Sequence, residues 1–179
     1  MTKAEMIRML SEYDPVDGNE IIFKNQIIDF IKNNGNFLGT RNLTGHLTGS
    51  AWIVNYDRSR ALLTHHKAIN KWLQLGGHTE EGESVIDASI REATEESGLT
   101  SLRFLSGRIF DIDVHRIPAK GEKPEHYHYD IRFIFEADDK EEIKISHESI
   151  DVRWVELGMI ELFNNSESIT RMKQKTKGY

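Results

Sequence analysis

The chain has 179 residues, of which 38% are hydrophobic and 29% are charged, and its formal net charge is −6. This length and composition suit one compact domain with a small extension, and the negative charge disfavours non-specific binding to nucleic acid or to an anionic membrane. The absence of cysteine excludes disulfides, thiolate metal sites and a cysteine nucleophile.

The N-terminal residues contain no continuous apolar stretch of the kind found in signal peptides. No apolar run elsewhere in the sequence approaches the length of a membrane span. We therefore expect a cytoplasmic protein that does not associate with a membrane, and the charge gives no reason to expect a nucleic-acid partner.

Two amphipathic helices are predicted at the N-terminus, over residues 2–13 and 21–31. They precede the first strand pattern, so we expect residues 1–44 to form a helical extension that packs on a main domain spanning residues 45–179. Two other roles remain open for the extension: it could mediate a homodimer, or it could cover the substrate.

From residue 45 the hydrophobic pattern changes to that of strands. Residues 46–54 and 61–66 are predicted to form two strands joined by a turn. Residues 72–75 are short and extended, and they lead into the Gly76-Gly77 pair, where the backbone can approach a ligand closely. Trp72 could pack under this loop or lie beside a substrate.

The segment from Gly77 to Leu99 is predicted to be a glycine loop followed by a helix. Ser84 is a suitable N-cap, and Gly98 occupies the position where a left-handed residue ends a helix. A helical projection places small and apolar residues on one face, which we expect to pack on the protein: Ile86, Ile90, Ala93 and Ser97.

Three carboxylates, those of Glu92, Glu95 and Glu96, fall on the opposite face at spacings that make them neighbours. Such a cluster is usually a solvated helix face. The spacing of the whole segment indicates a functional site instead, because its seven fixed residue types from Gly77 to Gly98 would coincide by chance only about once in 10⁸ to 10⁹ positions. Oxygen ligands favour Mg²⁺ or Mn²⁺ over zinc. Arg91 can offset part of the charge or hold one carboxylate in place.

At these residues the chain resembles the Nudix hydrolase family, whose signature GX₅EX₇REUXEEXGU (U is a bulky apolar residue) is matched at each fixed position. Ala93 is a small residue at the first U, and Leu75 stands where many relatives have proline. The resemblance implies an α/β fold, a mixed-sheet α/β/α sandwich, which here carries the N-terminal helical extension. It also implies an enzyme that hydrolyses the diphosphate bond of a small-molecule substrate, a nucleoside diphosphate linked to another group X.

The same resemblance implies the roles of individual residues. Glu95 and Glu96 would be ligands of Mg²⁺ or Mn²⁺, Glu92 would be a ligand or a general base, and Glu83 would support the site. A backbone carbonyl of the glycine pair, at Gly76 or Gly77, would be a further ligand. The candidate catalytic carboxylates are Glu92, Glu95 and Glu148, the last because this region of the family often supplies an extra carboxylate or base.

After the helix, strands are predicted over residues 102–104, 107–115, 126–135 and 152–155, and the C-terminal segments 159–163 and 169–177 are predicted to be helical. Alternation gives residues 107–115 and 126–135 a polar face composed of Asp111, Asp113, His115, His126, His128, Asp130 and Arg132. Paired histidine and aspartate can bind a metal, but we expect this face to contact substrate and not zinc. Arg108 and Arg132 are candidate phosphate contacts.

Two alternatives remain beside the hydrolase. The fold also hosts an isomerase of isopentenyl diphosphate, but this chain has no cysteine for that chemistry. A non-catalytic Nudix-like module that senses a nucleotide would keep the fold without cleaving its ligand; the intact acidic pattern argues against it. The identity of X lies in residues outside the signature, and fold analogy cannot name it.

Overall fold

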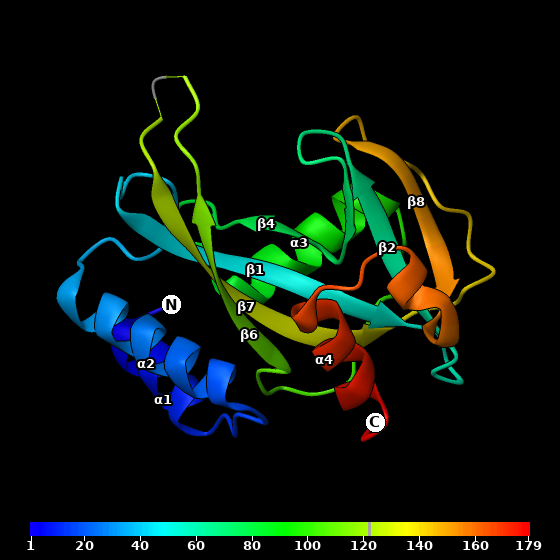
Figure 1. Cartoon of the computed structure of the whole chain (residues 1–179), viewed down its shortest axis with the longest axis horizontal. Helices are drawn as coiled ribbons and strands as arrows, with labels where there is room; N and C mark the ends of the chain where they lie inside the picture. The colour runs from blue at the N-terminus through cyan, green and yellow to red at the C-terminus, as the bar shows by residue number, and fades with distance from the viewer. Residues whose placement is uncertain (122) are drawn as a thin grey trace.

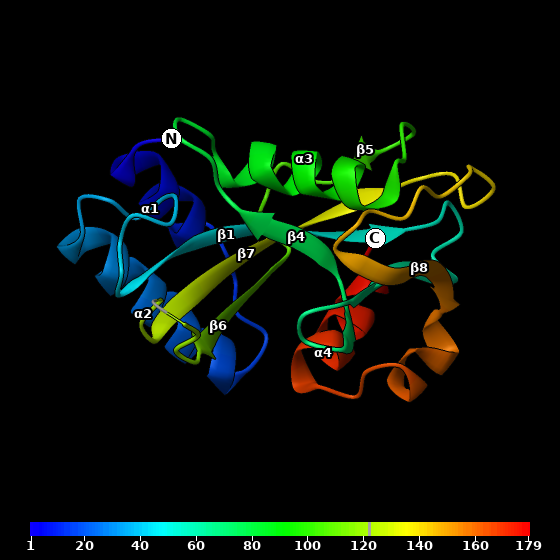
Figure 2. The ribbon, with the colours of Figure 1, turned by 90° about the horizontal axis from the view of Figure 1, so that it is seen from above.

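A mixed sheet of eight strands runs through the middle of the protein, with helices on both faces (Figures 1 and 2). The structure is a computed structural model that describes residues 1–121 and 123–179. The α/β sandwich with a mixed sheet that the sequence predicted is confirmed. In chain order the elements are α1 (Lys3–Ser11), α2 (Gly18–Asn33), β1 (Gly45–Val54), β2 (Arg60–His66), β3 (Lys71–Leu73), β4 (Leu75–His78), α3 (Val85–Ser97), β5 (Arg103–Phe104), β6 (Asp111–Ile117), β7 (His126–Glu136), β8 (Ser149–Glu156), a 3-10 helix (Leu157–Leu162) and α4 (Glu167–Thr176).

Strand β1 is the centre of the sheet, and all of its residues are buried. It runs parallel to β7 along its whole length, from the pair Gly45–Tyr127 to the pair Val54–Glu136. Its middle residues also pair in antiparallel fashion with β4, which delivers the chain to the glycine pair. Strands β2, β3 and β8 extend the sheet on one side, and β5 and β6 pair with β7.

The two faces of the sheet differ in character, because side chains alternate along β1 and β7. On one face, the odd-numbered positions Leu47, Ala51 and Ile53 join the core with Ile131 and Phe133. On the other face, Trp52 and Ile134 pack with residues of α4 in a second cluster. Figure 2 shows α3 above the sheet and α4 below it.

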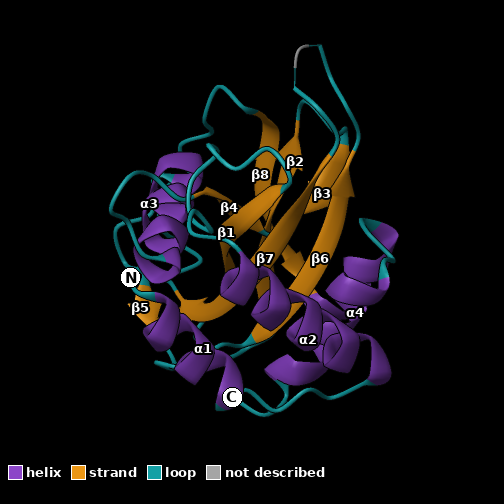
Figure 3. Cartoon of the chain, turned by 90° about the vertical axis from the view of Figure 1, so that its left-hand side faces the viewer, coloured by secondary structure: helices purple, strands orange, loops and turns teal. Residues whose placement is uncertain are grey.

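The N-terminal helices pack on the same face as α3. Figure 3 shows α1 and α2 beside each other. Met6, Leu10, Ile27 and Ile31 belong to the core cluster of that face, and the ring of Phe30 stacks on Tyr129 with centroids 4.3 Å apart. Ile21, near the start of α2, is 53% exposed and lies outside this core.

Two further observations bear on the predictions. The strand expected from residue 107 begins only at Asp111, as β6. No helix among residues 1–121 and 123–179 is both long and apolar enough to cross a membrane.

Candidate functional site

The glycine pair Gly76-Gly77 lies in β4, and the acidic helix that carries Glu92, Glu95 and Glu96 is α3. The Ser84 hydroxyl oxygen accepts a hydrogen bond from the Asp87 amide, and Gly98 ends the helix in the left-handed conformation with φ 71°. Both predicted caps are confirmed. The first turns of α3 lie close to β1 at Gly49, where a Cβ atom would be 3.1 Å from the Ala88 side chain and still closer to the helix backbone. Glycine at this position therefore lets the helix approach the sheet.

The face that α3 buries matches the predicted one in part, because Ala93 and Ser97 are buried and Ile86 packs against the core. Its buried residues are Val85, Ala88, Ser89, Ala93, Glu96 and Ser97, whereas 39% of Ile90 is exposed. Close packing against β1 favours the small side chains, and it turns the helix so that Glu92 and Glu96 point toward β4. Among the three carboxylates of the cluster, only that of Glu95 is largely in solvent.

The Glu96 carboxylate accepts a hydrogen bond from the backbone N–H of Gly76 at 2.9 Å. Burial raises the pKa of this carboxyl to about 7, against the opposing effect of the Gly76 hydrogen bond, and the nearby negative charges of Glu92, Glu148 and Glu95 raise it further. The deepest acid of the helix is thus held directly against the glycine pair.

The Glu92 carboxylate lies against Gly77. A Cβ atom at Gly77 would be 2.5 Å from the Glu92 carboxyl carbon, so only glycine leaves room for this side chain. Burial raises the pKa of Glu92, although its hydrogen bond with Arg91 opposes the shift.

Arg91 holds the acidic side chains of the loop and helix together. Its guanidinium donates to Glu83 at 2.9 and 3.0 Å, to Glu92 at 3.0 Å and to Glu95 at 3.1 Å. It also donates to the His78 carbonyl at 2.9 Å, which ties the helix to the end of β4. The hydrogen bond to Glu83 is the largest cause of the raised pKa of Arg91, and it lowers the pKa of Glu83 in turn.

These residues fit a hard divalent cation. The donors are carboxylate oxygens next to backbone carbonyls of a glycine pair, as Mg²⁺ and Mn²⁺ prefer. Burial raises the pKa of both Glu92 and Glu96. A cation would favour the ionised forms that burial disfavours.

Glu148 lies in the loop before β8, and its side chain is 58% exposed. Its charge raises the pKa of both Glu92 and Glu96, so the structure brings it near the acidic helix. Its role as an extra carboxylate or base stays a prediction.

Arg132 is placed differently from the prediction. Its side chain is 1% exposed, and its guanidinium binds three carboxylates, those of Asp111 and Asp130 at 2.8 Å and that of Asp113 at 3.1 Å. Since these acids already compensate its charge, the geometry argues against a phosphate contact and for a structural role. The sequence predicted the shared polar face correctly, but not that the acids on it would enclose the arginine.

The structure does not bring Arg108 and Trp72 to the acidic helix. Arg108 is exposed and lines a small cavity with Met9, Glu12 and Tyr13 at α1. Trp72 stacks on His65 with ring centroids 4.9 Å apart, and the Arg153 guanidinium carbon lies 5.1 Å from the Trp72 ring centroid. These contacts make Trp72 a packing residue at the edge of the sheet.

Sequence reasoning missed the residues that β1, β4 and the position just before β4 add to the polar face. The hydroxyls of Thr48 and Ser50 donate to Asp130 at 2.9 and 2.7 Å, and the Gln74 amide donates to the same carboxylate at 3.1 Å. His46 and His78 lie beside His128 at the far end of this face. The alternation of the polar residues His46, Thr48 and Ser50 along β1 is visible in the sequence and could have identified them as part of this face.

Sequence comparison finds a matching family model and a relative. Residues 46–174 match the family model of the NUDIX domain. Over 140 residues the chain is 28% identical to a protein of Lactococcus lactis subsp. cremoris named "Probable DHNTP pyrophosphohydrolase", and the match covers 76% of this chain and 81% of that one.

Solved structures show the same fold. An Ap4A hydrolase of C. elegans in a binary complex superposes with a TM-score of 0.59 at 19% identity, covering 74% of this chain and 95% of that one. The dihydroneopterin triphosphate pyrophosphohydrolase of E. coli gives a TM-score of 0.53 at 16% identity, covering 74% and 96%.

Proposed function

Because the chain belongs to the Nudix hydrolase family, we propose that it hydrolyses the diphosphate bond of a nucleoside diphosphate linked to another group X, with Mg²⁺ or Mn²⁺ as its cofactor. The observation that carries this proposal is the arrangement of the acidic helix. Glu96 is held by Gly76 at 2.9 Å, Glu92 lies against Gly77, and Arg91 joins Glu83, Glu92 and Glu95.

Glu95 and Glu96, with a backbone carbonyl at Gly77, are the proposed ligands of the cation, and Glu92 either completes this set or acts as the general base. When bound, such a cation neutralises charge on the diphosphate oxygens and lowers the pKa of a bound water. Arg91 keeps the carboxylates together before the cation binds, because its positive charge offsets the repulsion between them. Glu83 orients Arg91 through two hydrogen bonds.

Two carboxylates are candidates for the group that removes a proton from the attacking water. Glu92 is held by Arg91 and has a pKa raised by burial. Glu148 is exposed, with His147 at 3.9 Å as its neighbour, so its side chain is free to reach toward a substrate. The pH profiles of kcat for Glu92→Gln and Glu148→Gln distinguish them, because loss of the base removes the acidic limb of the profile.

The substrate class can be tested among compounds that carry a diphosphate bond. The Lactococcus relative is named a DHNTP pyrophosphohydrolase, which makes a pterin triphosphate a substrate to test beside nucleoside diphosphate sugars, dinucleoside polyphosphates and oxidised nucleoside triphosphates. All of them carry the same diphosphate bond.

The test is a screen for released phosphate, pyrophosphate and nucleotide over this panel, with Mg²⁺, with Mn²⁺ and with chelator. We expect one class of compound to be cleaved, and only when metal is present. If no compound is cleaved but one of them raises the melting temperature, the protein is instead a Nudix-like sensing module. Cleavage that persists in chelator would contradict the proposed cofactor.

A further inference from the structure

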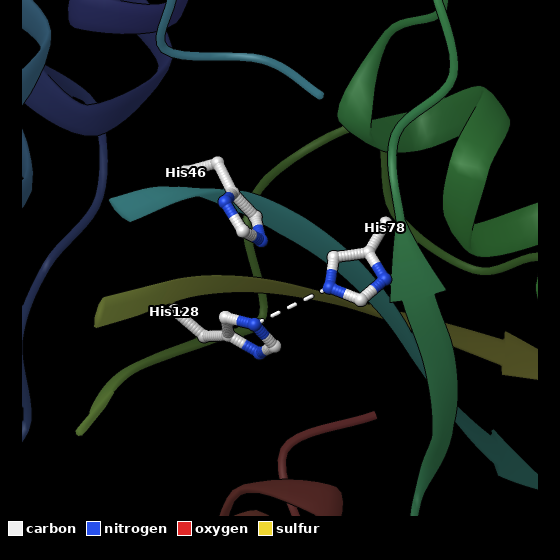
Figure 4. Close-up of side chains that lie close together, drawn as sticks. All are labelled: His46, His78 and His128. Atoms are coloured by element: carbon white, nitrogen blue, oxygen red, sulfur yellow. Dashed lines mark hydrogen bonds between the residues drawn. The ribbon is translucent and has the colours of Figure 1, made fainter. Parts of the chain in front are cut away.

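Histidines from different strands gather at the end of the polar face, next to the acidic helix but made of different ligands. His46 lies in β1, His78 at the end of β4, and His126 and His128 in β7. His46 and His128 are partners in the parallel pairing of β1 with β7. Figure 4 shows the rings of His46, His78 and His128 turned toward one another.

Among the residues that the structure describes, these three histidines are the metal-ligating group that converges, with one ligand atom from each lying within 4.8 Å of the others. The Nε2 atoms of His78 and His128 are 3.3 Å apart. Two nitrogens bound to one tetrahedral zinc at its usual bond length of about 2.0–2.1 Å would be about 3.3–3.4 Å apart. This pair is therefore already at the spacing that such an ion imposes.

His46 supplies a second, independent observation. It is 2% exposed, and neither of its ring nitrogens has a hydrogen-bond partner among the described residues. Its ring centroid is 4.9 Å from that of His78 and 4.8 Å from that of His128. Buried polar groups normally have a partner, and a metal ion between these rings would provide one.

The positions of the protons on the rings of His126 and His128 also favour a bound metal ion. Nδ1 of His126 is 2.9 Å from the Pro124 carbonyl oxygen, which can only accept, so this nitrogen carries the proton. In the neutral ring, Nε2 of His126 then presents a lone pair to Nε2 of His128, 3.2 Å away. His128 Nε2 faces both His126 and His78, and one proton cannot serve both contacts well, whereas a cation could accept lone pairs from several rings.

The rings of His46 and His128 are also in the form that binds metal. Burial is the main cause that lowers the pKa of His46 to about 4 and that of His128 to about 3, and the neighbouring histidines add to it. Neutral imidazoles are the metal-binding form of histidine.

We propose that His46, His78 and His128 bind a transition-metal ion of the Zn²⁺ class, separate from the cation proposed for Glu92, Glu95 and Glu96. Imidazole nitrogens suit zinc and its neighbours, whereas carboxylate oxygens suit Mg²⁺ and Mn²⁺. Three ligands leave a fourth position for water, for a substrate or for His126. The structure thus favours the metal site over the plain substrate contact expected from the sequence.

The test measures zinc bound by the full-length protein in a large excess of Mg²⁺, which keeps the carboxylate site occupied. Wild-type protein should retain about one Zn²⁺ per chain, and Co²⁺ used in its place should give the intense visible absorption of a tetrahedral site. His46→Asn and His128→Asn should each weaken Zn²⁺ binding by at least about 100-fold, since even residues behind a ligand account for about 10- to 100-fold.

Two controls make the result specific. His147→Asn changes a histidine whose side chain is 91% exposed, and it should leave Zn²⁺ binding unchanged. Glu96→Gln should also keep it, because that residue belongs to the other site. If His46→Asn does not fold, His128→Asn decides the matter at a less buried position.

The proposal is overturned if wild-type protein binds no Zn²⁺ in excess Mg²⁺, or if His128→Asn binds it as tightly as wild type. Loss of Zn²⁺ binding in Glu96→Gln but not in the histidine variants would assign the ion to the carboxylates instead. None of these outcomes depends on catalytic activity, so failure of this proposal is distinguishable from failure of the proposed hydrolase.

Discussion

The backbone N–H of Gly76 donates to the buried Glu96 carboxylate at 2.9 Å, which joins the end of the acidic helix to the strand that precedes it. The contact links residues 20 positions apart in sequence. It holds the Glu96 carboxylate in place, and burial raises the pKa of this group to about 7. The acidic helix is therefore fixed by the protein before any cation binds, at a cost in the stability of the metal-free form.

That cost predicts a pH dependence. A carboxyl whose pKa is raised from 4.5 to about 7 on folding binds its proton more tightly in the folded state. Its contribution to stability is present below about pH 4.5 and is lost as the pH rises through about 7, with a total on the order of 3 kcal/mol. Urea unfolding of wild type and Glu96→Gln in chelator, from pH 4.5 to 8, measures it.

Glu96→Gln should remove this part of the pH slope and should be the more stable protein at pH 8 without metal. Mg²⁺ should narrow the difference in the free energy of unfolding between the two proteins by stabilising wild type, since a ligand that binds only the folded state stabilises that state. Parallel stability curves for the two proteins in chelator would show that Glu96 does not titrate as its burial requires.

Gly77→Ala tests the close approach of Glu92 to the glycine pair. The added Cβ would overlap the Glu92 carboxylate, so this side chain must leave its position, and we expect kcat to fall by about 10- to 100-fold, the range for residues that orient metal ligands. Gly107→Ala is the matched control, because a Cβ there meets nothing within 4 Å. Equal activity of the two variants would refute the packing argument.

Arg132→Met tests whether this arginine is structural. Removing it leaves the buried acids Asp111, Asp113 and Asp130 without their shared cation, and we expect a loss of about 3–5 kcal/mol in the free energy of unfolding. Arg116→Met, which breaks an exposed pair with Glu125, should cost less than about 1 kcal/mol.

A different result would restore the phosphate contact that the sequence predicted for Arg132. In that case Arg132→Met would unfold at the same denaturant concentration as wild type, and its KM for the diphosphate substrate would rise. The two measurements therefore separate the structural and the substrate-binding role.

The sequence predicted the features that local rules govern. The caps at Ser84 and Gly98 follow from the preferences of helix ends, and the polar face of β6 and β7 follows from alternation along a strand. The register then pairs His115 with His128 and Asp111 with Arg132, as a shared face requires.

Features that depend on distant segments could not be predicted in the same way. The enclosure of Arg132 involves Ser168 of α4 as well as the acids of β6. The histidine cluster depends on the antiparallel register that places His78 of β4 opposite Thr48 of β1. The burial of Glu96 depends on how closely α3 approaches Gly49, which a helical projection alone does not contain.

The measurement that tests the central claim most directly is kcat of Glu96→Gln on whichever diphosphate compound the wild-type protein cleaves with Mg²⁺. Circular dichroism and the unfolding midpoint first establish that the variant is folded. Removing a proposed metal ligand predicts a fall in kcat of more than about 100-fold, beyond the effect of residues that only support a ligand. A folded Glu96→Gln protein with full activity would contradict the assignment of the acidic helix as the catalytic site.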